Sequence, residues 1–498
     1  MYESPAGAPL FAFDNSYARL PAGFFARVSP TPVVAPRLIR VNDALAAELG
    51  LDPRQLASAA GISVLAGNAL PTGAEPLAMA YAGHQFGGFV PQLGDGRAIL
   101  LGEILRPDRE RRDVQLKGSG PTPFSRRGDG RAALGPVLRE YLLSEAFAAL
   151  GIPTTRALAA VTTGESVWRE TALPGAVLTR VAASHVRVGT FQFFAARGDV
   201  PAVRRLADYV IERHYPTGAS AAKPYRAFLD AVIQRQARLI ARWMSVGFIH
   251  GVMNTDNMSV AGETIDFGPC AFMDGYDPAT VYSSIDRGGR YAYGNQPAIA
   301  HWNLARLAET LLPLLADEET AALEEANDAL SGFKVSFERA YAECFAAKIG
   351  IGTVVSEDVV LIEALLAAMA KGKADFTLTF RGLCDLVDPA VDATPVRALF
   401  AEVDAFDVWK QRWHDRLAHQ GTSLPSVRAA MRAVNPHFIA RNHLVEEAIV
   451  AAVERSDFSV FEALLTVLER PFDDQPQASR YGRPPRPDQI VRQTFCGT

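Results

Sequence analysis

An asparagine and an aspartate lie close together in the chain, at a spacing suited to holding a divalent metal ion. They are Asn257 and Asp266, within the segment HGVMNTDNMSVAGETIDFG, residues 250–268. The short apolar runs Met258–Val260 and Thr264–Ile265 predict two strands joined by a turn, which would bring both side chains to one edge of a cleft. Mg²⁺ prefers hard oxygen ligands and usually completes its shell with phosphate or water. The segment therefore predicts a site for a nucleotide-bound metal ion.

The same segment keeps part of the catalytic pattern of protein kinases. That pattern is H-R-D-x-x-x-x-N followed by D-F-G, and its first Asp accepts the proton of the substrate hydroxyl. Here His250 and Asn257 keep the spacing, and Asp266 begins the D-F-G tripeptide, but Val252 stands where the catalytic Asp would be. The tripeptide alone is weak evidence, because such an Asp is usually a loop residue. Together with the upstream match, it predicts a kinase-like metal site that lacks the usual base.

A lysine and a glutamate upstream complete the kinase-like order. Asp113–Lys117 predicts a strand whose alternation places Gln115 and Lys117 on one face. Leu134–Leu150 predicts a helix that contains Glu140. In kinases a Glu on the helix after the strand fixes the Lys against the nucleotide phosphates. A solvated Glu and an unrelated surface Lys would be the default alternative, but the order of glycine turn, Lys, Glu, Asn and D-F-G favours a kinase-like fold.

Glycines and arginines supply further candidate phosphate ligands. In the turn LGDGR, Gly94 and Gly96 allow the backbone to approach a phosphate closely, and Arg97 adds a charge. Arg180 and Arg187 fall near the expected junction of two lobes, and a guanidinium group binds phosphate oxygens in pairs. Taken singly, the turn is usually only a turn, and a structural salt bridge explains either arginine equally well.

The composition limits the partners and the location of the protein. The net charge of −5 provides no global basic field to attract nucleic acid or an anionic membrane. The four cysteines are widely separated, which argues against a disulfide framework and a zinc site. No apolar run is long enough to span a bilayer, and the first residues do not resemble a secretory signal. We expect a cytoplasmic protein that binds neither nucleic acid nor membrane.

The length and the periodicity predict an α+β, bilobal protein-kinase-like fold with a strand-rich N-lobe and a larger helical C-lobe. A chain of 498 residues exceeds one average domain. Apolar spacing predicts a buried helix at Tyr225–Val246 that carries the catalytic loop, and more helices at 299–315, 320–330, 358–370 and 444–453. The expected divisions are an N-terminal lobe with the phosphate contacts (1–188), a helical lobe with the metal site (189–470) and an irregular tail ending in Cys-Gly-Thr (471–498).

The order of these motifs resembles the selenoprotein O (YdiU) family. The resemblance rests on LGDGR, DVQLKGSGPTPFSRRGDGRAAL, HGVMNTDN, IDFGPCAFMD and the C-terminal CGT, and it extends from Tyr81 to Cys496. It implies a kinase-like fold that binds ATP in a flipped orientation. It also implies transfer of AMP, rather than the γ-phosphoryl group, to Ser, Thr or Tyr hydroxyls of proteins, with release of pyrophosphate.

The resemblance also implies roles for individual residues. Asp256 would be the proton acceptor, Glu140 would pair with Lys117, and Asn257 and Asp266 would hold Mg²⁺, with Mn²⁺ as an alternative. The nucleotide would contact Gly94, Gly96, Arg97, Lys117, Asp129, Gly130, Arg180, Arg187 and Asp266. A flipped nucleotide would place its γ-phosphate deep, near Lys117 and the two arginines, and would account for Val252 and for the additional arginines together.

Three other functions stay open at this point. The same site could transfer UMP from UTP with Mn²⁺, or the protein could be a γ-phosphoryl-transferring kinase, or it could be a catalytically silent nucleotide-binding scaffold. Val252 argues against the kinase, and the intact Lys, Asn and Asp set argues against the scaffold. Ser283 and Tyr291 are candidate sites of self-modification, and the role of Cys496 is left open.

Overall fold

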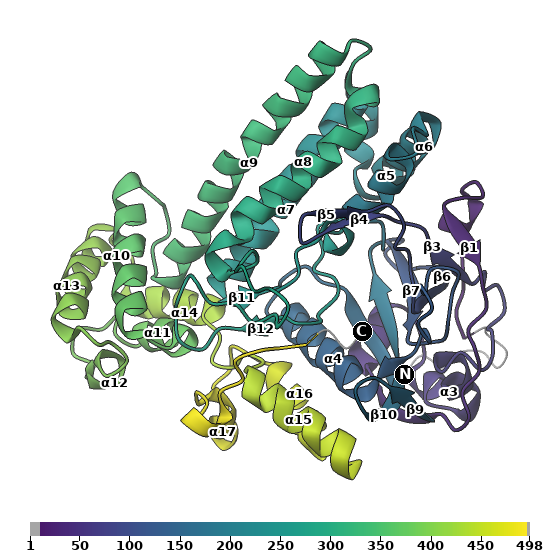
Figure 1. The fold of residues 1–498 in the computed structure, drawn as a ribbon. Helices are drawn as coiled ribbons and strands as arrows, with labels where there is room; N and C mark the ends of the chain where they lie inside the picture. Colours follow the sequence, from purple (N-terminus) through teal and green to yellow (C-terminus); the bar gives the residue numbers. More distant parts are fainter. Residues whose placement is uncertain (1–9, 496–498) are drawn as a thin grey trace.

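The computed structural model describes residues 10–495. It has a mixed α+β architecture, with a strand-rich N-terminal part and a larger helical C-terminal part (Figure 1). This arrangement confirms the predicted fold class and is consistent with a kinase-like fold. The domain boundaries after residues 188 and 470 stay predictions, and Cys496 lies outside the described residues. None of the helices of residues 10–495 is long and apolar enough to cross a membrane.

The N-terminal part is built on one twisted antiparallel sheet of eight strands. Its order is β1-β3-β6-β7-β10-β9-β2, with β8 pairing with β10. The strands are β1 Phe25–Arg27, β2 Arg37–Val41, β3 Leu77–Met79, β6 Ala98–Leu105, β7 Arg111–Lys117, β8 Ala132–Ala133, β9 Arg156–Trp168 and β10 Ala172–Ala182. Placing β7 between β6 and β10 puts its side chains at the centre of the sheet.

The two faces of this sheet pack against different helices. One face packs against the short helices α1 Asp43–Glu48, α2 Pro53–Leu56 and α3 Ala59–Leu65, and it buries Val114 and Leu116 of β7 in a small apolar core. The opposite face carries α4 (Leu134–Ala149), which packs on β9 and β10. Gln115 and Lys117 lie on that second face, as the alternation along β7 predicts.

The C-terminal part is organised around α7 (Pro224–Ser245), which is buried along one side and precedes the catalytic-loop segment. It packs against α8 and α9, and the three lie side by side in Figure 1. α15 and α16 pack back against α4 and so join the two parts. The remaining helices are α5 Val188–Ala195, α6 Val200–His214, α8 Gln296–Leu315, α9 Glu319–Lys348, α10 Ser356–Gly372, α11 Phe376–Leu383, α12 Thr394–Arg397, α13 Val403–His419, α14 Leu424–Val434, α15 Asn442–Arg455, α16 Ser459–Leu468 and α17 Ser479–Gly482.

The predicted hairpin of Met258–Val260 with Thr264–Ile265 is wrong. Ser259 instead makes a single bridge to Arg187, and Thr264 makes one to Thr154, so each half pairs with a distant segment. Strands of two or three residues have too little pairing to stand alone, and tertiary partners decide their path. The apolar side chains that suggested strands are buried in the core as parts of a loop.

One buried lysine, Lys348, lacks an acidic partner among the described residues. Lys348 lies at the end of α9 with its Nζ 4.4 Å from the centre of the Phe380 ring, and it has no ion pair within residues 10–495. Burial lowers the pKa of Lys348 to about 7. The unfolded chain, with an ordinary lysine pKa, binds more protons than the folded chain above that pH. The contribution of Lys348 to stability therefore increases as the pH rises from about 7 toward 10.

We expect Lys348→Met to raise the melting temperature at pH 7 by at least ~2 °C, the shift that about 1 kcal/mol produces in a domain of a few hundred residues. It should also flatten the increase of stability between pH 7 and pH 9. Thermal unfolding at several pH values measures both effects. Lys334→Met, at an exposed position of the same helix, is the control. A lower melting temperature for Lys348→Met at pH 7 would contradict this account.

Candidate active site

The predicted site residues converge on one cleft of about 810 Å³. Its walls come from the glycine turn 93–97, the loop 118–131, strands β7 and β10, and the segment 252–269. The predicted residues that line it are Gly94, Gly96, Arg97, Lys117, Asp129, Gly130, Arg180, Arg187, Asp256, Asn257 and Asp266. Glu140 is buried behind Lys117 and does not line the cleft.

Three cations meet at the carboxylate of Asp266. Lys117 Nζ lies 2.9 Å from Oδ1, Arg180 Nη1 lies 2.7 Å from Oδ1, and Arg187 Nη1 lies 3.2 Å from Oδ2. Burial alone would raise the pKa of Asp266, but attraction to the three cations outweighs it and holds this pKa well below its usual range. Asp266 is therefore ionised, and it is the counterion that all three cations share.

The backbone of Asp266 is itself unusual. Its φ of +64° lies in the left-handed region, which residues other than glycine rarely adopt. The three ion pairs of its side chain hold the residue in place, and its carbonyl accepts a hydrogen bond from the Gly268 nitrogen at 2.9 Å. Strained residues of this kind concentrate at ligand-binding and catalytic sites. In this conformation the carboxylate contacts Lys117 of β7 and Arg180 of β10.

Two further side chains hold the cations in place. Glu140 of α4 lies 2.5 Å from Lys117 Nζ and 3.2 Å from Arg180 Nη1. Gln115 of β7 accepts hydrogen bonds from Arg180 Nε and Nη2 at 3.1 and 2.6 Å, and donates one to Asp95 at 3.2 Å. Sequence reasoning did not include Gln115 among the site residues. Its position on the same strand face as Lys117 was the available signal.

Asp256 lies in the short 3₁₀ turn Thr255–Asn257 and is almost fully buried. Gln85 Nε2 donates to its Oδ2 at 3.1 Å, whereas its Oδ1 has no hydrogen-bond partner among residues 10–495. Burial raises the pKa of Asp256 to about 6. Arg187 donates to the Asp256 backbone oxygen at 2.9 Å and so fixes the turn. A carboxylate with one free oxygen and this pKa is chemically suited to accept a proton near neutral pH.

Asn257 and Asp266 fit a metal that takes most of its ligands from elsewhere. Asn257 Nδ2 donates to the Val252 carbonyl at 3.0 Å, which occupies the nitrogen and leaves the side-chain oxygen as the end able to coordinate. Both residues line the same cleft. No cluster of three or more His, Cys, Asp or Glu side chains suited to a metal occurs within residues 10–495. Such a donor set suits Mg²⁺ or Mn²⁺ completed by phosphate or water, rather than a closed structural site.

The glycine turn and the loop 118–131 are packed together without room for side chains. A Cβ on Gly94, whose φ is +71°, would lie 2.3 Å from the Phe124 ring. A Cβ on Gly130, whose φ is +65°, would lie 2.1 Å from the Gly120 carbonyl carbon. Asp129 lies apart from the cation cluster, at the rim, where it pairs with Arg169 at 2.9 Å. Its contact with a nucleotide stays a prediction.

A hairpin from the N-terminal part covers the catalytic-loop segment. It consists of β4 (Gly83–Gln85) and β5 (Gly88–Val90). The His84 nitrogen donates to Thr255 Oγ1 at 2.7 Å, and the Phe86 nitrogen donates to Asn254 Oδ1 at 3.1 Å. Sequence reasoning missed this contact, since nothing in the local pattern shows which segment the hairpin will cover.

The two candidate self-modification residues are not accessible in this structure. Tyr291 is 1% exposed and donates its hydroxyl hydrogen to Asn254 at 2.6 Å. Ser283 is 4% exposed and lies in a bridge to Thr494. Neither hydroxyl could reach a nucleotide without rearrangement of the segment, and self-modification stays a prediction that needs other residues.

The fold and the cleft place the chain in the kinase-like class, with Lys117, Glu140, Asn257 and Asp266 in the order found in kinases. A family model described as "Protein adenylyltransferase SelO" matches residues 10–469. Proteins named "Protein nucleotidyltransferase YdiU" from Methylorubrum extorquens and a Bradyrhizobium species are each 65% identical, and one from Rhodopseudomonas palustris is 64% identical. These three alignments cover 98% of this chain and 99% of each relative. The chain belongs to the SelO/YdiU family and is a nucleotidyltransferase.

Removing one charge from the buried cluster around Asp266 should lower the free energy of unfolding strongly. Glu140→Gln keeps the size of the side chain but leaves Lys117 and Arg180 without one of their two carboxylate partners. Removing one partner of a buried ion pair costs about 3 kcal/mol or more. We expect the free energy of unfolding in urea to fall by that amount.

Glu338→Gln is the matched control, since Glu338 and Lys334 form an exposed pair within one helix. Such pairs contribute at most ~0.5 kcal/mol. Equal losses for Glu140→Gln and Glu338→Gln would show that the cluster is not a source of stability.

Proposed function

We propose that the protein transfers AMP from ATP to Ser, Thr or Tyr hydroxyls of other proteins and releases pyrophosphate, with the ATP bound in a flipped orientation. The observation that carries the proposal is the convergence of Lys117, Arg180 and Arg187 on one carboxylate. AMP transfer places the developing negative charge on the leaving pyrophosphate, and a cluster of three cations suits that charge. The family description, which names protein adenylyl transfer, supports the same chemistry.

The cations would bind the β- and γ-phosphates. Phosphate oxygens offer Lys117, Arg180 and Arg187 the charge that Asp266 provides in their absence. Asp266 would then be free to turn toward the nucleotide-bound metal together with Asn257. Bound Mg²⁺ or Mn²⁺ would supply positive charge that neutralises the phosphate oxygens. Glu140 and Gln115 would keep Lys117 and Arg180 in position throughout.

Asp256 would act as the proton acceptor. The substrate hydroxyl oxygen would form a bond to the α-phosphorus while the bond from that phosphorus to the bridging oxygen of pyrophosphate breaks. The hydroxyl proton would pass to Asp256, whose Oδ1 lacks a hydrogen-bond partner within residues 10–495 but is buried, so the substrate hydroxyl would have to displace the groups that cover it. Gln85 and Arg187 would hold the carboxylate in place through its Oδ2 and its backbone oxygen. This role for Asp256 explains how a site with Val252 at the kinase base position could still activate a hydroxyl.

UMP transfer from UTP with Mn²⁺ is the second candidate. The name of the relatives specifies a nucleotidyltransferase and not which nucleotide is transferred. The cation cluster recognises the triphosphate and not the base, so it would serve UTP equally well.

Labelled nucleotides test the proposed reaction. The protein is incubated with Mg²⁺ or Mn²⁺, a mixture of candidate protein substrates and ATP labelled at the α- or the γ-phosphate. We expect protein-bound label from α-labelled ATP only, and at least ~100-fold less with Asp266→Ala, because the variant loses metal and phosphate positioning. α-Labelled UTP in a parallel reaction distinguishes UMP transfer. Label from the γ position alone would establish a kinase instead, and retention of ATP without any label would favour a silent scaffold.

Substitution of Gly83, which packs against Asp256, tests the role of Asp256 without changing its carboxylate. A Cβ on Gly83 would lie 2.4 Å from Asp256 Oδ1, so Gly83→Ala must displace that oxygen. We expect the rate of AMP transfer to fall by at least ~100-fold, the contribution of a general base, while ATP affinity changes little.

Gly88→Ala on the same hairpin is the matched control, since its Cβ would make only an ordinary contact of 3.5 Å. Equal rates for Gly83→Ala and the wild type, measured with α-labelled ATP, would exclude Asp256 as the base.

A further inference from the structure

A second cavity, of about 930 Å³, lies outside the active-site cleft. It is bounded by the turn between β6 and β7, by α6, by α7 and by the turn 261–263. Its lining contains nine arginines and three glutamates. A chain with a net charge of −5 thus concentrates positive charge in one concave place, and such a concentration attracts anions.

Several of these arginines have no acidic partner. Arg109, Arg205 and Arg238 are exposed, and their side chains make no hydrogen bond or ion pair with any of residues 10–495. Arg235 donates to the carbonyls of Ala261 and His214, and Arg242 donates to that of Gly151. Their charge is not neutralised by these contacts, so the cavity keeps an uncompensated positive field.

The helix α7 arranges three of the arginines along the cavity. Arg235, Arg238 and Arg242 are spaced by three and four residues, so they lie on one face of the helix. Like charges at this spacing repel each other and destabilise a helix when nothing neutralises them. Arg205 lines the same cavity from α6. Guanidinium groups of α6 and α7 could therefore bind one ligand together.

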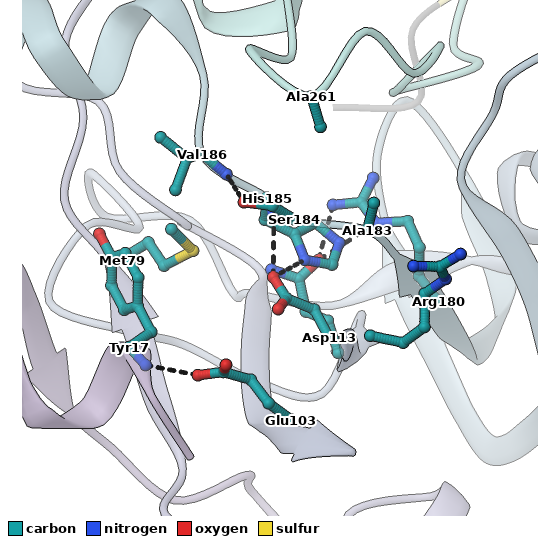
Figure 2. A network of polar contacts seen from close by, with 12 residues as sticks. Tyr17, Met79, Glu103, Asp113, Arg180, Ala183, Ser184, His185, Val186 and Ala261 are labelled. Carbon is teal, nitrogen blue, oxygen red and sulfur yellow. Dashed lines mark hydrogen bonds and ion pairs between the residues drawn. The ribbon is translucent and has the colours of Figure 1, made fainter. Parts of the chain in front are cut away.

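One arginine of the lining is already neutralised inside the protein. Arg213 of α6 pairs with Asp113 at 2.5 Å and with Glu103 at 3.0 Å. Figure 2 shows the adjoining contacts, in which the His185 ring faces Asp113 and the Tyr17 backbone nitrogen donates to Glu103. These charges are already matched inside the protein. The arginines of the lining without a carboxylate partner are the groups left to bind a ligand.

The acidic residues of the lining weaken this field only in part. Glu110 is paired with Arg112 at 2.6 Å. Glu263 is held by a hydrogen bond from the Ala183 nitrogen at 2.9 Å, and burial raises its pKa to about 7, so it is partly protonated near neutral pH. Glu212, on α6, is the remaining acid. Four of the nine arginines, Arg19, Arg111, Arg112 and Arg213, are paired with carboxylates. The other five outnumber Glu212 and the partly protonated Glu263, so the cavity keeps an excess of positive charge.

We propose that this cavity is a second anion site, which binds a small ligand with at least two adjacent phosphate groups. Guanidinium groups favour phosphate because their planar fork matches pairs of phosphate oxygens. Arginines on α6 and α7 offer more than one such fork, which a single phosphate could not use. The volume of about 930 Å³ admits a short phosphate chain. Inorganic polyphosphate and the phosphate chain of a nucleotide share this chemistry.

The cavity and the active-site cleft share two backbone segments. Ala261 and Glu263 line it and belong to the loop that joins Asn257 to Asp266. Ala183 also lines it, and follows Arg180 along the chain. An occupant would thus contact segments whose other ends supply the candidate metal and phosphate ligands.

Binding of inorganic triphosphate to the full chain tests the proposal. Isothermal titration gives the affinity, and hydrogen exchange locates the site by comparing peptides over 200–214 and 235–245 with a peptide over the glycine turn 93–97. We expect protection of the α6 and α7 peptides. The double variant Arg205→Ala/Arg238→Ala should weaken that site by at least ~10-fold, or about 1.4 kcal/mol, because two charged contacts are lost.

The control is Arg412→Ala/Arg455→Ala, which removes two exposed arginines outside the cavity and should leave the affinity within about twofold. Parallel titrations with ATP and adenosine distinguish the source of the phosphate. Protection of α6 and α7 by ATP identifies a nucleotide ligand, whereas protection by triphosphate alone identifies an inorganic one. Protection only at 93–97, equal affinities of the two double variants, or protection of α6 and α7 by adenosine would overturn the proposal. None of these outcomes depends on transfer activity.

Discussion

The attraction between Asp266 and three cations is the interaction on which the rest of this site depends. Burying four charged groups is costly unless each has a partner in good geometry. The sheet order brings Lys117 and Arg180 together from adjacent strands, α4 supplies Glu140, and the start of α5 supplies Arg187. Elements from a long stretch of the chain must therefore be in place before this cluster is satisfied.

The sequence indicated the parts of the site that follow from local pattern. The alternation along β7 put Lys117 on the correct face, and the helix that contains Glu140 was recognisable from its apolar spacing. Contacts set by tertiary packing were not recognisable. Gln85 reaches Asp256 from a hairpin far away in the chain, and the segment after Asn257 pairs with distant residues instead of with itself. Such contacts depend on where elements meet in space, which local pattern does not encode.

The cleft and the arginine-rich cavity differ in whether their positive charges have carboxylate partners. In the cleft, Lys117, Arg180 and Arg187 are paired with carboxylates that belong to the site itself, chiefly Asp266 and Glu140. In the cavity, Arg205 and Arg238 remain without a partner within residues 10–495. The first arrangement favours a ligand that replaces an internal counterion, and the second favours a ligand that supplies the missing one.

The hairpin of β4 and β5 has a consequence for motion. Two-lobed enzymes often admit their ligands by swinging the lobes apart about a hinge. Here the hairpin, although it comes from the N-terminal part, is bonded to Asn254, Thr255 and Asp256. A wide clamshell opening would have to break these bonds and would expose Asp256 to water. The hairpin therefore fastens the N-terminal part to the catalytic-loop segment, so that a wide separation of the two lobes would cost three hydrogen bonds as well as the burial of Asp256.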